Sequence, residues 1–245
     1  MKTILTPEFI NSKKFKDLLL AEPKFLNKPL TNGQYYSTIH PKRGVMWHHT
    51  AGLNASGAWA WWNQTPERVG TPFIIDRDGT IWVCFDPKFW AYHLGVKGDD
   101  DSLEKQTVSI ELVSGGALYG PKSDTFYPLY PKLIKPTIIN PDDIYTPQEP
   151  INGESFRGIK SYHAYSDAQV IASCQLLVWL KAKFPTIVIP NELGKFWIYN
   201  PEVITKSLPG IHSHSTVRKD KNDIFPQENF IQALQVTCSY LSKKK

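Results

Sequence analysis

A run of polar and ionisable residues in the last part of the chain, HSHSTVRKDKNDIFP (212–226), contains the residue types of a metal site. His214 is followed seven places later by Lys221 and nine places later by Asp223. Imidazole nitrogen and carboxylate oxygen are zinc ligands, and a nearby ammonium group can stabilise a developing oxyanion. Because the run carries many charges and little apolar periodicity, it predicts a loop rather than a buried strand or a helix.

Two adjacent histidines, His48 and His49, end a short apolar run upstream, GVMWHH (44–49). The apolar residues predict a buried strand that ends at the histidines. A single histidine in such a place is more often a buried structural residue than a ligand. The metal hypothesis therefore depends on the occurrence of both segments in one chain.

A carboxylate lies in the middle of another predicted strand, QTVSIELVS (106–114). Alternation places Val108, Ile110 and Leu112 on one face of this strand and Glu111 on the other. A carboxylate that faces a dry core is costly. The face that carries Glu111 is therefore expected to line a polar cleft.

These residues lie among segments whose patterns alternate between strand and helix. A hairpin is expected where PFIID and TIWVCF (72–85) flank an Asp78-Gly79 turn. The expected helices cover residues 12–20, 55–63, 167–184, with Ser166 as the cap and Pro185 at the end, and 226–241. Interleaved strands and helices predict an α/β fold with a mixed central β-sheet flanked by helices.

The chain is expected to contain a single domain over residues 41–241. Residues 1–40 precede it as an N-terminal lead-in, and residues 242–245 form a basic tail. Seven prolines fall between Pro121 and Pro150, which predicts a proline-rich insertion or cover at about 115–160.

The composition is that of a folded globular protein, with 41% hydrophobic and 13% aromatic residues in 245. A net charge of +5 suits an anionic partner, but the cations are dispersed apart from the terminal lysines, so no nucleic-acid partner is expected. Three cysteines without metal-ligand spacing predict neither a disulfide framework nor a zinc ribbon.

The N-terminal residues MKTILTPEFINSKKF lack the apolar core of a signal peptide, because Pro7, Glu8 and Asn11 interrupt it. No apolar stretch approaches the roughly 18 residues of a membrane span. The expectation is a protein made in the cytoplasm without stable membrane insertion. The sequence does not indicate an oligomeric state, and a monomer is expected.

In their order along the chain, six segments resemble the type 2 N-acetylmuramoyl-L-alanine amidases. This zinc amidase family also contains the peptidoglycan-recognition proteins and the amidase-type phage lysozymes. The resemblance covers about residues 44–235, interrupted by the proline-rich insertion. The segments are GVMWHHTAG, PFIIDRDGTIW, WAYHLG, TVSIELVS, YSDAQVIAS and HSTVRKDKNDIFP.

The resemblance implies a Zn²⁺ ion held by His48, His214 and Asp223. Two neutral imidazoles and a carboxylate would leave the fourth position of a tetrahedral zinc open, as in catalytic sites. His212 with Asp220, eight residues apart, also falls within the spacing of the family and stays an alternative pair.

The resemblance also implies the catalytic residues. Glu111 matches a general base, and Lys221 matches the basic residue beside the third ligand. Where several family members carry a tyrosine, this chain has Thr71 and Pro72, so more of the catalysis is assigned to Glu111 and Lys221. The residues expected to bind substrate, in a cleft for a sugar and a peptide, are Trp47, His49, Trp90 and His93.

The implied activity is hydrolysis of the amide between N-acetylmuramic acid and L-alanine in peptidoglycan. The absence of a signal peptide favours a phage-type lysin that reaches the cell wall by a holin-type route. Two alternatives remain, a cytosolic amidase that recycles soluble anhydro-muropeptides and a non-catalytic peptidoglycan-binding module. The three filled ligand positions argue against the binding module.

Overall fold

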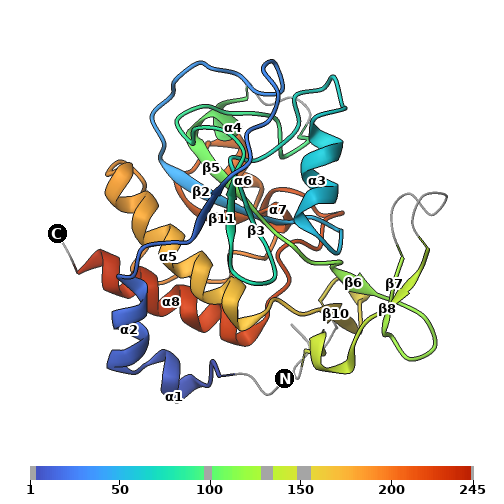
Figure 1. Ribbon diagram of the computed structural model, residues 1–245. Helices are drawn as coiled ribbons and strands as arrows, with labels where there is room; N and C mark the ends of the chain where they lie inside the picture. Colours follow the sequence, from blue (N-terminus) through green and yellow to red (C-terminus); the bar gives the residue numbers. More distant parts are fainter. Residues whose placement is uncertain (1–3, 97–100, 128–134, 148–155, 244–245) are drawn as a thin grey trace.

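A six-stranded mixed β-sheet lies at the centre of the molecule, with helices on both faces (Figure 1). The computed structural model describes residues 4–96, 101–127, 135–147 and 156–243. The strands follow the order β1-β4-β3-β5-β2-β11. Their bounds are β1 Phe25–Asn27, β2 Gly44–His49, β3 Phe73–Ile75, β4 Ile81–Val83, β5 Thr107–Leu112 and β11 Gly210–Ser213. The α/β prediction is confirmed.

The strands in the middle of the sheet are parallel. One face of the sheet is apolar, and the opposite face carries the polar residues. β2 pairs with β5 on one side and β11 on the other, and only β3 with β4 is antiparallel. Val45 and Trp47 of β2 join the main core, whereas Met46 lies in a smaller cluster on the opposite face. Because side chains alternate along a strand, His48 projects on the same face as Met46.

The apolar face is covered by the long helices α5 (Asp167–Lys183) and α8 (Glu228–Ser242), with α2 (Lys13–Leu19) packed beside α5. Ser166 caps α5 as predicted. Its hydroxyl accepts from the Gln169 amide, and the Gln169 side chain accepts from the Ser166 amide. In the described ranges, no helix combines the length and the apolar character that a membrane crossing requires.

The opposite face is covered by shorter helices and loops. They are α3 (Ala55–Trp62), α4 (Ser102–Gln106), α6 (Pro201–Thr205) and α7 (His214–Val217). Leu103 of α4 and Val203 of α6 pack with Met46 in the smaller cluster. Because these elements are short, they leave polar side chains between them, and the candidate site lies here.

The predicted hairpin is present, with β3 and β4 joined through Gly79. Gly79 has φ +82°, a conformation that side-chain-bearing residues rarely adopt. A Cβ atom at this position would also come within 2.9 Å of the Ala168 carbonyl oxygen, at the start of α5. The glycine thus permits both the turn and the close packing of the hairpin on α5.

The prediction of an irregular loop from residue 212 is wrong for its first part. Residues 210–213 form the edge strand β11, which pairs with β2, and His214 begins the single turn α7. Gly44 and Gly210 allow this pairing, since a Cβ on Gly44 would lie 2.6 Å from the Gly210 carbonyl oxygen. Backbone pairing with β2, which local sequence does not reveal, determines the structure here.

The N-terminal lead-in contains more structure than the sequence predicts. The helix expected at 12–20 is α2, but α1 (Pro7–Ile10) and the edge strand β1 were missed. β1 lies between Pro23 and Pro29 and pairs in parallel with β4. Its three residues are too few to give a period-two signal.

Short strands lie in the described parts of the proline-rich region and directly after it. They form a three-stranded sheet, β6-β10-β9, and a two-stranded hairpin, β7-β8, which extends away from the central sheet (Figure 1). The bounds are β6 Ala117–Leu118, β7 Thr125–Phe126, β8 Thr137–Ile138, β9 Ile144–Tyr145 and β10 Ser161–His163, with 3-10 turns at Pro141–Asp143 and Phe156–Gly158. The rest of the predicted insertion, 128–134 and 148–155, lies outside the described residues.

Candidate active site

His48, His214 and Asp223 converge at the ends of β2 and β11. His48 Nδ1 lies 3.3 Å, and His214 Nδ1 3.0 Å, from the same Asp223 oxygen, Oδ2. The two imidazole rings are 4.6 Å apart between centroids. All three residues are buried. The structure therefore brings together the three residues that the sequence analysis proposed as ligands.

The donor atoms have the chemistry and the spacing that a divalent ion requires. One ligand atom from each residue can be chosen so that all three lie within 4.8 Å of one another. A tetrahedral zinc ion with bonds of about 2.0–2.2 Å separates its ligand atoms by about 3.4 Å. The His48 and His214 nitrogens lie near that distance from Asp223, so the cluster could hold a metal ion.

The burial of these residues favours the protonation states that bind a metal. Burial lowers the pKa of His48 from 6.5 to about 4, which keeps its imidazole neutral at pH 7. Burial opposes ionisation of Asp223, but the neighbouring His214 and hydrogen bonds from His214 and His48 hold its pKa well below the usual range. Neutral imidazole and ionised carboxylate are the liganding forms.

Glu111 lies beside this cluster because of the strand register. Its Cα is the β-sheet partner of the His48 Cα, so both side chains project from neighbouring strands on one face. Burial, followed by the charge of Asp223, raises the pKa of Glu111 well above its usual value, and Lys221 opposes this shift. Glu111 Oε2 is buried and has no hydrogen-bond partner among the described residues.

His49 lies next to the cluster but is held by the core. Its Nδ1 is 3.1 Å from the Tyr165 hydroxyl, and its ring packs against Phe225. A Cβ on Gly116 would come within 2.5 Å of His49 Nε2. His49 is therefore enclosed by protein on several sides, and it supports the end of β2.

His93 contacts His48 directly. Its Nδ1 is 3.0 Å from His48 Nε2, and the two rings meet edge to face at 83°. Its Nε2 is 3.4 Å from the Thr107 hydroxyl. Both ring nitrogens thus face protein groups. Burial and the neighbouring His48 lower its pKa well below 6.5.

Two expected substrate-binding residues lie elsewhere, and these expectations are corrected. Trp47 is fully buried in the main core, edge to face with Phe230 of α8, because it projects from β2 on the face opposite to His48. Trp90 stacks on Tyr36 at 4.2 Å, and its indole N–H donates to Thr38. The lead-in therefore covers Trp90.

The alternative pair, His212 and Asp220, is not brought together with His48. The His212 ring hydrogen-bonds through Nε2 to the Leu208 carbonyl, 2.9 Å away. Both Asp220 oxygens accept from the Arg218 guanidinium, and this carboxylate is exposed. Among the described residues, the cluster that could hold a metal contains His214 and Asp223.

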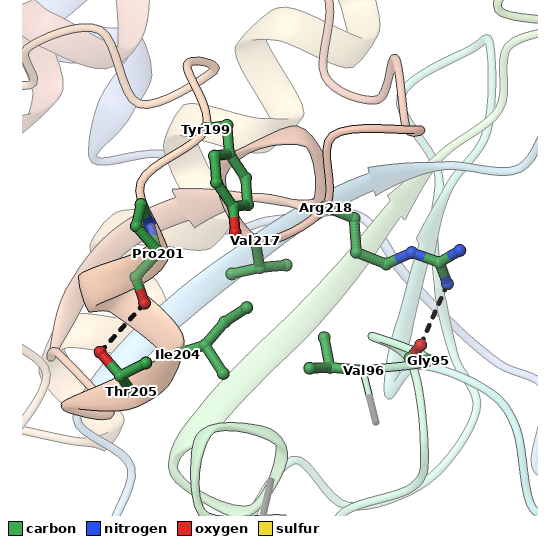
Figure 2. Close-up of a pocket in the computed structure, with 8 residues that line it drawn as sticks. All are labelled: Gly95, Val96, Tyr199, Pro201, Ile204, Thr205, Val217 and Arg218. Atoms are coloured by element: carbon green, nitrogen blue, oxygen red, sulfur yellow. Dashed lines mark hydrogen bonds between the residues drawn. The ribbon is translucent and has the colours of Figure 1, made fainter. Parts of the chain in front are cut away.

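A cavity of about 460 Å³ lies between α6, the end of α7 and residues 95–96 (Figure 2). Its lining is largely apolar, with Val96, Ile204 and Val217, and Tyr199 also faces it. At its edge, Arg218 donates to the Gly95 carbonyl. The cavity adjoins the segments that carry His214 and Leu94, but His48, His214 and Asp223 do not line it.

The sequence alone does not reveal two groups beside the cluster, the backbone carbonyl of Leu94 and the carboxylate of Glu104. The Leu94 carbonyl lies 2.9 Å from His214 Nε2, and Glu104 Oε1 accepts from the Leu94 amide at 2.9 Å. A backbone carbonyl has no residue type that a motif could specify. Glu104 lies in a short helix far along the chain from either histidine, so only the folded structure connects them.

One comparison with known proteins identifies the family. The model of the family described as N-acetylmuramoyl-L-alanine amidase matches residues 38–228. The structure is similar to that of the hydrolase AmiA of Staphylococcus aureus in complex with its ligand, with a TM-score of 0.53 and 10% identity, covering 95% of this chain and 93% of that chain. This similarity concerns the fold. No curated protein sequence matches.

Two further solved structures are more distant. The endolysin LysCS from Clostridium intestinale URNW has a TM-score of 0.39 and 14% identity, covering 81% of this chain and 86% of that chain. An AmpD derivative has a TM-score of 0.44 and 15% identity, covering 86% and 94%. The family model, however, spans more than half of the sequence. The chain belongs to the N-acetylmuramoyl-L-alanine amidase family, and it is an enzyme that hydrolyses an amide bond of peptidoglycan.

Proposed function

We propose that this amidase is zinc-dependent and acts on the cell wall as a phage-type lysin. The metal part of the proposal rests on one observation. A nitrogen of His48 and a nitrogen of His214 both lie against the same oxygen of Asp223. Three protein ligands of this kind are typical of catalytic zinc sites. A bound zinc ion would supply Lewis-acid chemistry, since it makes water nucleophilic near neutral pH and polarises a carbonyl.

Glu111 is the proposed proton carrier. It projects beside His48, and its Oε2 has no partner among the described residues. In its ionised form it can take a proton from the attacking water, and it can then deliver this proton to the leaving amino group of L-alanine. The raised pKa of Glu111 favours the first step, because the ionised carboxylate is a stronger base than an exposed one and holds the proton until the amine leaves.

Lys221 is the proposed oxyanion-stabilising residue. Its charge acts on both Glu111 and His49, which supports a position of the ammonium near the cluster. A cation near the carbonyl oxygen stabilises the negative charge that develops as the amide is attacked, an effect of about 3–4 kcal/mol for a well-placed donor.

Residues 41–241 are proposed to act as one catalytic domain. The lead-in packs on it, since α1 contacts α8, α2 contacts α5, and β1 extends the central sheet. The structured parts of 115–160 border the site through Gly116, which contacts His49. The net positive charge of the chain and the presence of this added region both support the proposal that the substrate is an extended anionic polymer, the cell wall. Delivery through a holin-type route belongs to the same proposal.

Product analysis tests the proposed activity. Intact sacculi digested with the purified protein should release L-alanine amino termini, detected by mass spectrometry, and metal analysis should find about one zinc per chain. A chelator should abolish the release, and added Zn²⁺ should restore it. Full activity in a protein free of metal would contradict zinc dependence.

The substrate separates the lysin from a recycling amidase. Turnover of intact sacculi is compared with turnover of soluble anhydro-muropeptides at equal concentrations of the cleavable bond. A lysin should cleave sacculi efficiently. Efficient cleavage of the soluble substrate alone would reject the lysin proposal and leave the amidase assignment intact.

A further inference from the structure

The outer ring nitrogens of both histidines in the cluster contact the same dipeptide. His48 Nε2 lies 3.0 Å from His93 Nδ1, and His214 Nε2 lies 2.9 Å from the carbonyl oxygen of Leu94. A carbonyl oxygen only accepts hydrogen bonds, so His214 must carry a proton on Nε2. Its Nδ1, which faces Asp223, is then the nitrogen that can bind a metal.

A chain of hydrogen bonds sets the direction of the His48–His93 contact. The Thr107 hydroxyl donates to the Leu103 carbonyl at 2.8 Å, so its oxygen can only accept from His93 Nε2. A neutral imidazole has one ring proton. With that proton on Nε2, His93 Nδ1 accepts from His48 Nε2–H. The nitrogen of His48 that is left for a metal ion is then Nδ1, which faces Asp223.

Glu104 holds the dipeptide itself. Its Oε1 accepts from the backbone amides of His93 at 3.2 Å and of Leu94 at 2.9 Å. Glu104 is buried in α4, which continues directly into β5. Because β5 pairs with β2, one rigid unit carries Glu104, Thr107 and, through the sheet, His48.

From these contacts we infer that His93 and the Leu94 carbonyl are the positioning groups that direct both imidazoles toward Asp223 through Nδ1, and that Glu104 fixes them in place. The inference rests on the proposed metal function. It assigns to His93 a role behind the site instead of contact with substrate. Groups that orient metal-binding histidines typically change metal affinity by about 10–100-fold when removed.

Zinc affinity of the metal-free protein tests His93. His93→Leu removes the acceptor for His48 with little change in volume, and zinc affinity, measured by competition with a chromophoric chelator, should fall about 10–100-fold. His93→Asn is the matched control, because its side-chain oxygen can occupy the position of Nδ1. It should stay within about threefold of the unmodified protein. Equal affinity in His93→Leu would overturn the role of His93.

Glu104 is tested by a second pair of variants. Glu104→Gln keeps an oxygen that accepts from both amides, whereas Glu104→Leu removes it. We expect the Leu variant alone to lose zinc affinity, by about tenfold or more. If the two variants bind zinc equally well, the role of Glu104 is wrong.

Ring protonation gives a readout that needs neither activity nor metal. Long-range ¹H–¹⁵N spectra at about pH 8 are recorded in an Asp223→Ala background, because in the metal-free protein the Asp223 carboxylate attracts a proton to the Nδ1 atoms of both histidines. In this background, Nε2 should be protonated in both His48 and His214. Thr107→Val is close in shape to the native residue and removes only the acceptor for His93. It should shift His48, and not His214, toward a mixture of tautomers. An unchanged His48 signal in this variant would contradict the hydrogen-bond chain.

The outcomes distinguish this inference from the proposed function. If the unmodified protein binds no zinc, the zinc proposal is wrong. If it binds zinc and the His93→Leu and Glu104→Leu variants bind equally well, only the positioning inference is wrong.

Discussion

The residues of the candidate site differ in how clearly their side-chain types indicate their chemical roles. His48, His214 and Asp223 have the side chains of metal ligands and meet at one carboxylate oxygen. Glu111 is recognisable in the sequence because it is a carboxylate on the polar face of a strand with period-two alternation. Its position beside His48 follows from the register of β5 on β2.

Replacement of Glu111 separates metal binding from catalysis. Glu111→Gln keeps the size of the side chain but cannot carry the proton, so turnover should fall by about 10²–10⁴-fold. Zinc content should remain near one per chain, because Glu111 is not among the three clustered ligand residues. The measurements are amide cleavage in sacculi and metal analysis. Unchanged turnover would remove Glu111 from the mechanism.

Two aspartates of the late segment provide a matched comparison for the metal. Asp223→Ala should lose zinc, since Asp223 contacts both histidines, whereas Asp220→Ala should retain it, because Asp220 is exposed and pairs with Arg218. Metal analysis after dialysis measures the difference. Loss of zinc from Asp220→Ala alone would restore His212 and Asp220 as the ligand pair.

Among the elements, the turn between β3 and β4 depends most on a single residue, Gly79. Gly79→Ala places a side chain at positive φ and within 2.9 Å of a carbonyl of α5. Gly33→Ala is a matched control, because Gly33 also has positive φ but has nothing within 4 Å of the added Cβ. Each should lose about 1–2 kcal/mol from strain, and Gly79→Ala should lose clearly more. If the two variants have equal free energies of unfolding, the start of α5 moves aside for the added methyl group without an energetic cost.

A histidine at β10 links stability to pH. His163 Nδ1 accepts from the Gly115 amide, and burial, followed by the charges of Arg77 and His49, lowers its pKa from 6.5 to about 3. Because the folded pKa is lowered, His163 stabilises the fold fully above about pH 6.5 and progressively less toward pH 3. The unfolded chain binds the proton first as the pH falls.

The variant His163→Asn isolates this effect, since its side-chain oxygen can accept from Gly115 but does not titrate. Between about pH 6 and pH 4, the free energy of unfolding of the unmodified protein should fall more steeply than that of the variant. The difference should reach about 1 kcal/mol per pH unit. Urea unfolding at several pH values measures it, and parallel pH profiles would contradict the prediction.

For the whole molecule, a metal at the cluster should couple elements that are distant in sequence. The ligands lie at the ends of β2 and β11 and beyond α7, so a bound ion ties both strands to the late segment. Zinc at about 1,000 times its dissociation constant would stabilise the fold by about 4 kcal/mol. For a chain of this size, chelation should therefore lower the melting temperature by roughly 8–16 °C.

Calorimetry with and without chelator measures this change, and Asp223→Ala serves as the control. The variant should melt at the same temperature in both conditions, because it lacks a ligand. A melting temperature of the unmodified protein that does not respond to chelator and zinc would contradict metal binding at the cluster.

Local patterns were sufficient for the elements that have long, regular sequence signals. The period-two pattern of β5, the capped helix α5 and the Asp78-Gly79 turn all lie where the sequence predicts them. Such elements are determined by interactions among residues close in the chain. β1 and β11 were missed because each is stabilised by pairing with a strand far away in the sequence.

The sequence by itself determined which residue types could bind a metal and move a proton, and their order along the chain indicated the family. The tertiary structure decided which histidine and which aspartate meet His48, and it placed Trp47 and Trp90 in packed surroundings. It also brought His93, Leu94 and Glu104 behind the two histidines. The physical reason is that strand register and backbone hydrogen bonds set the side-chain positions, and both depend on contacts between distant segments that no local pattern contains.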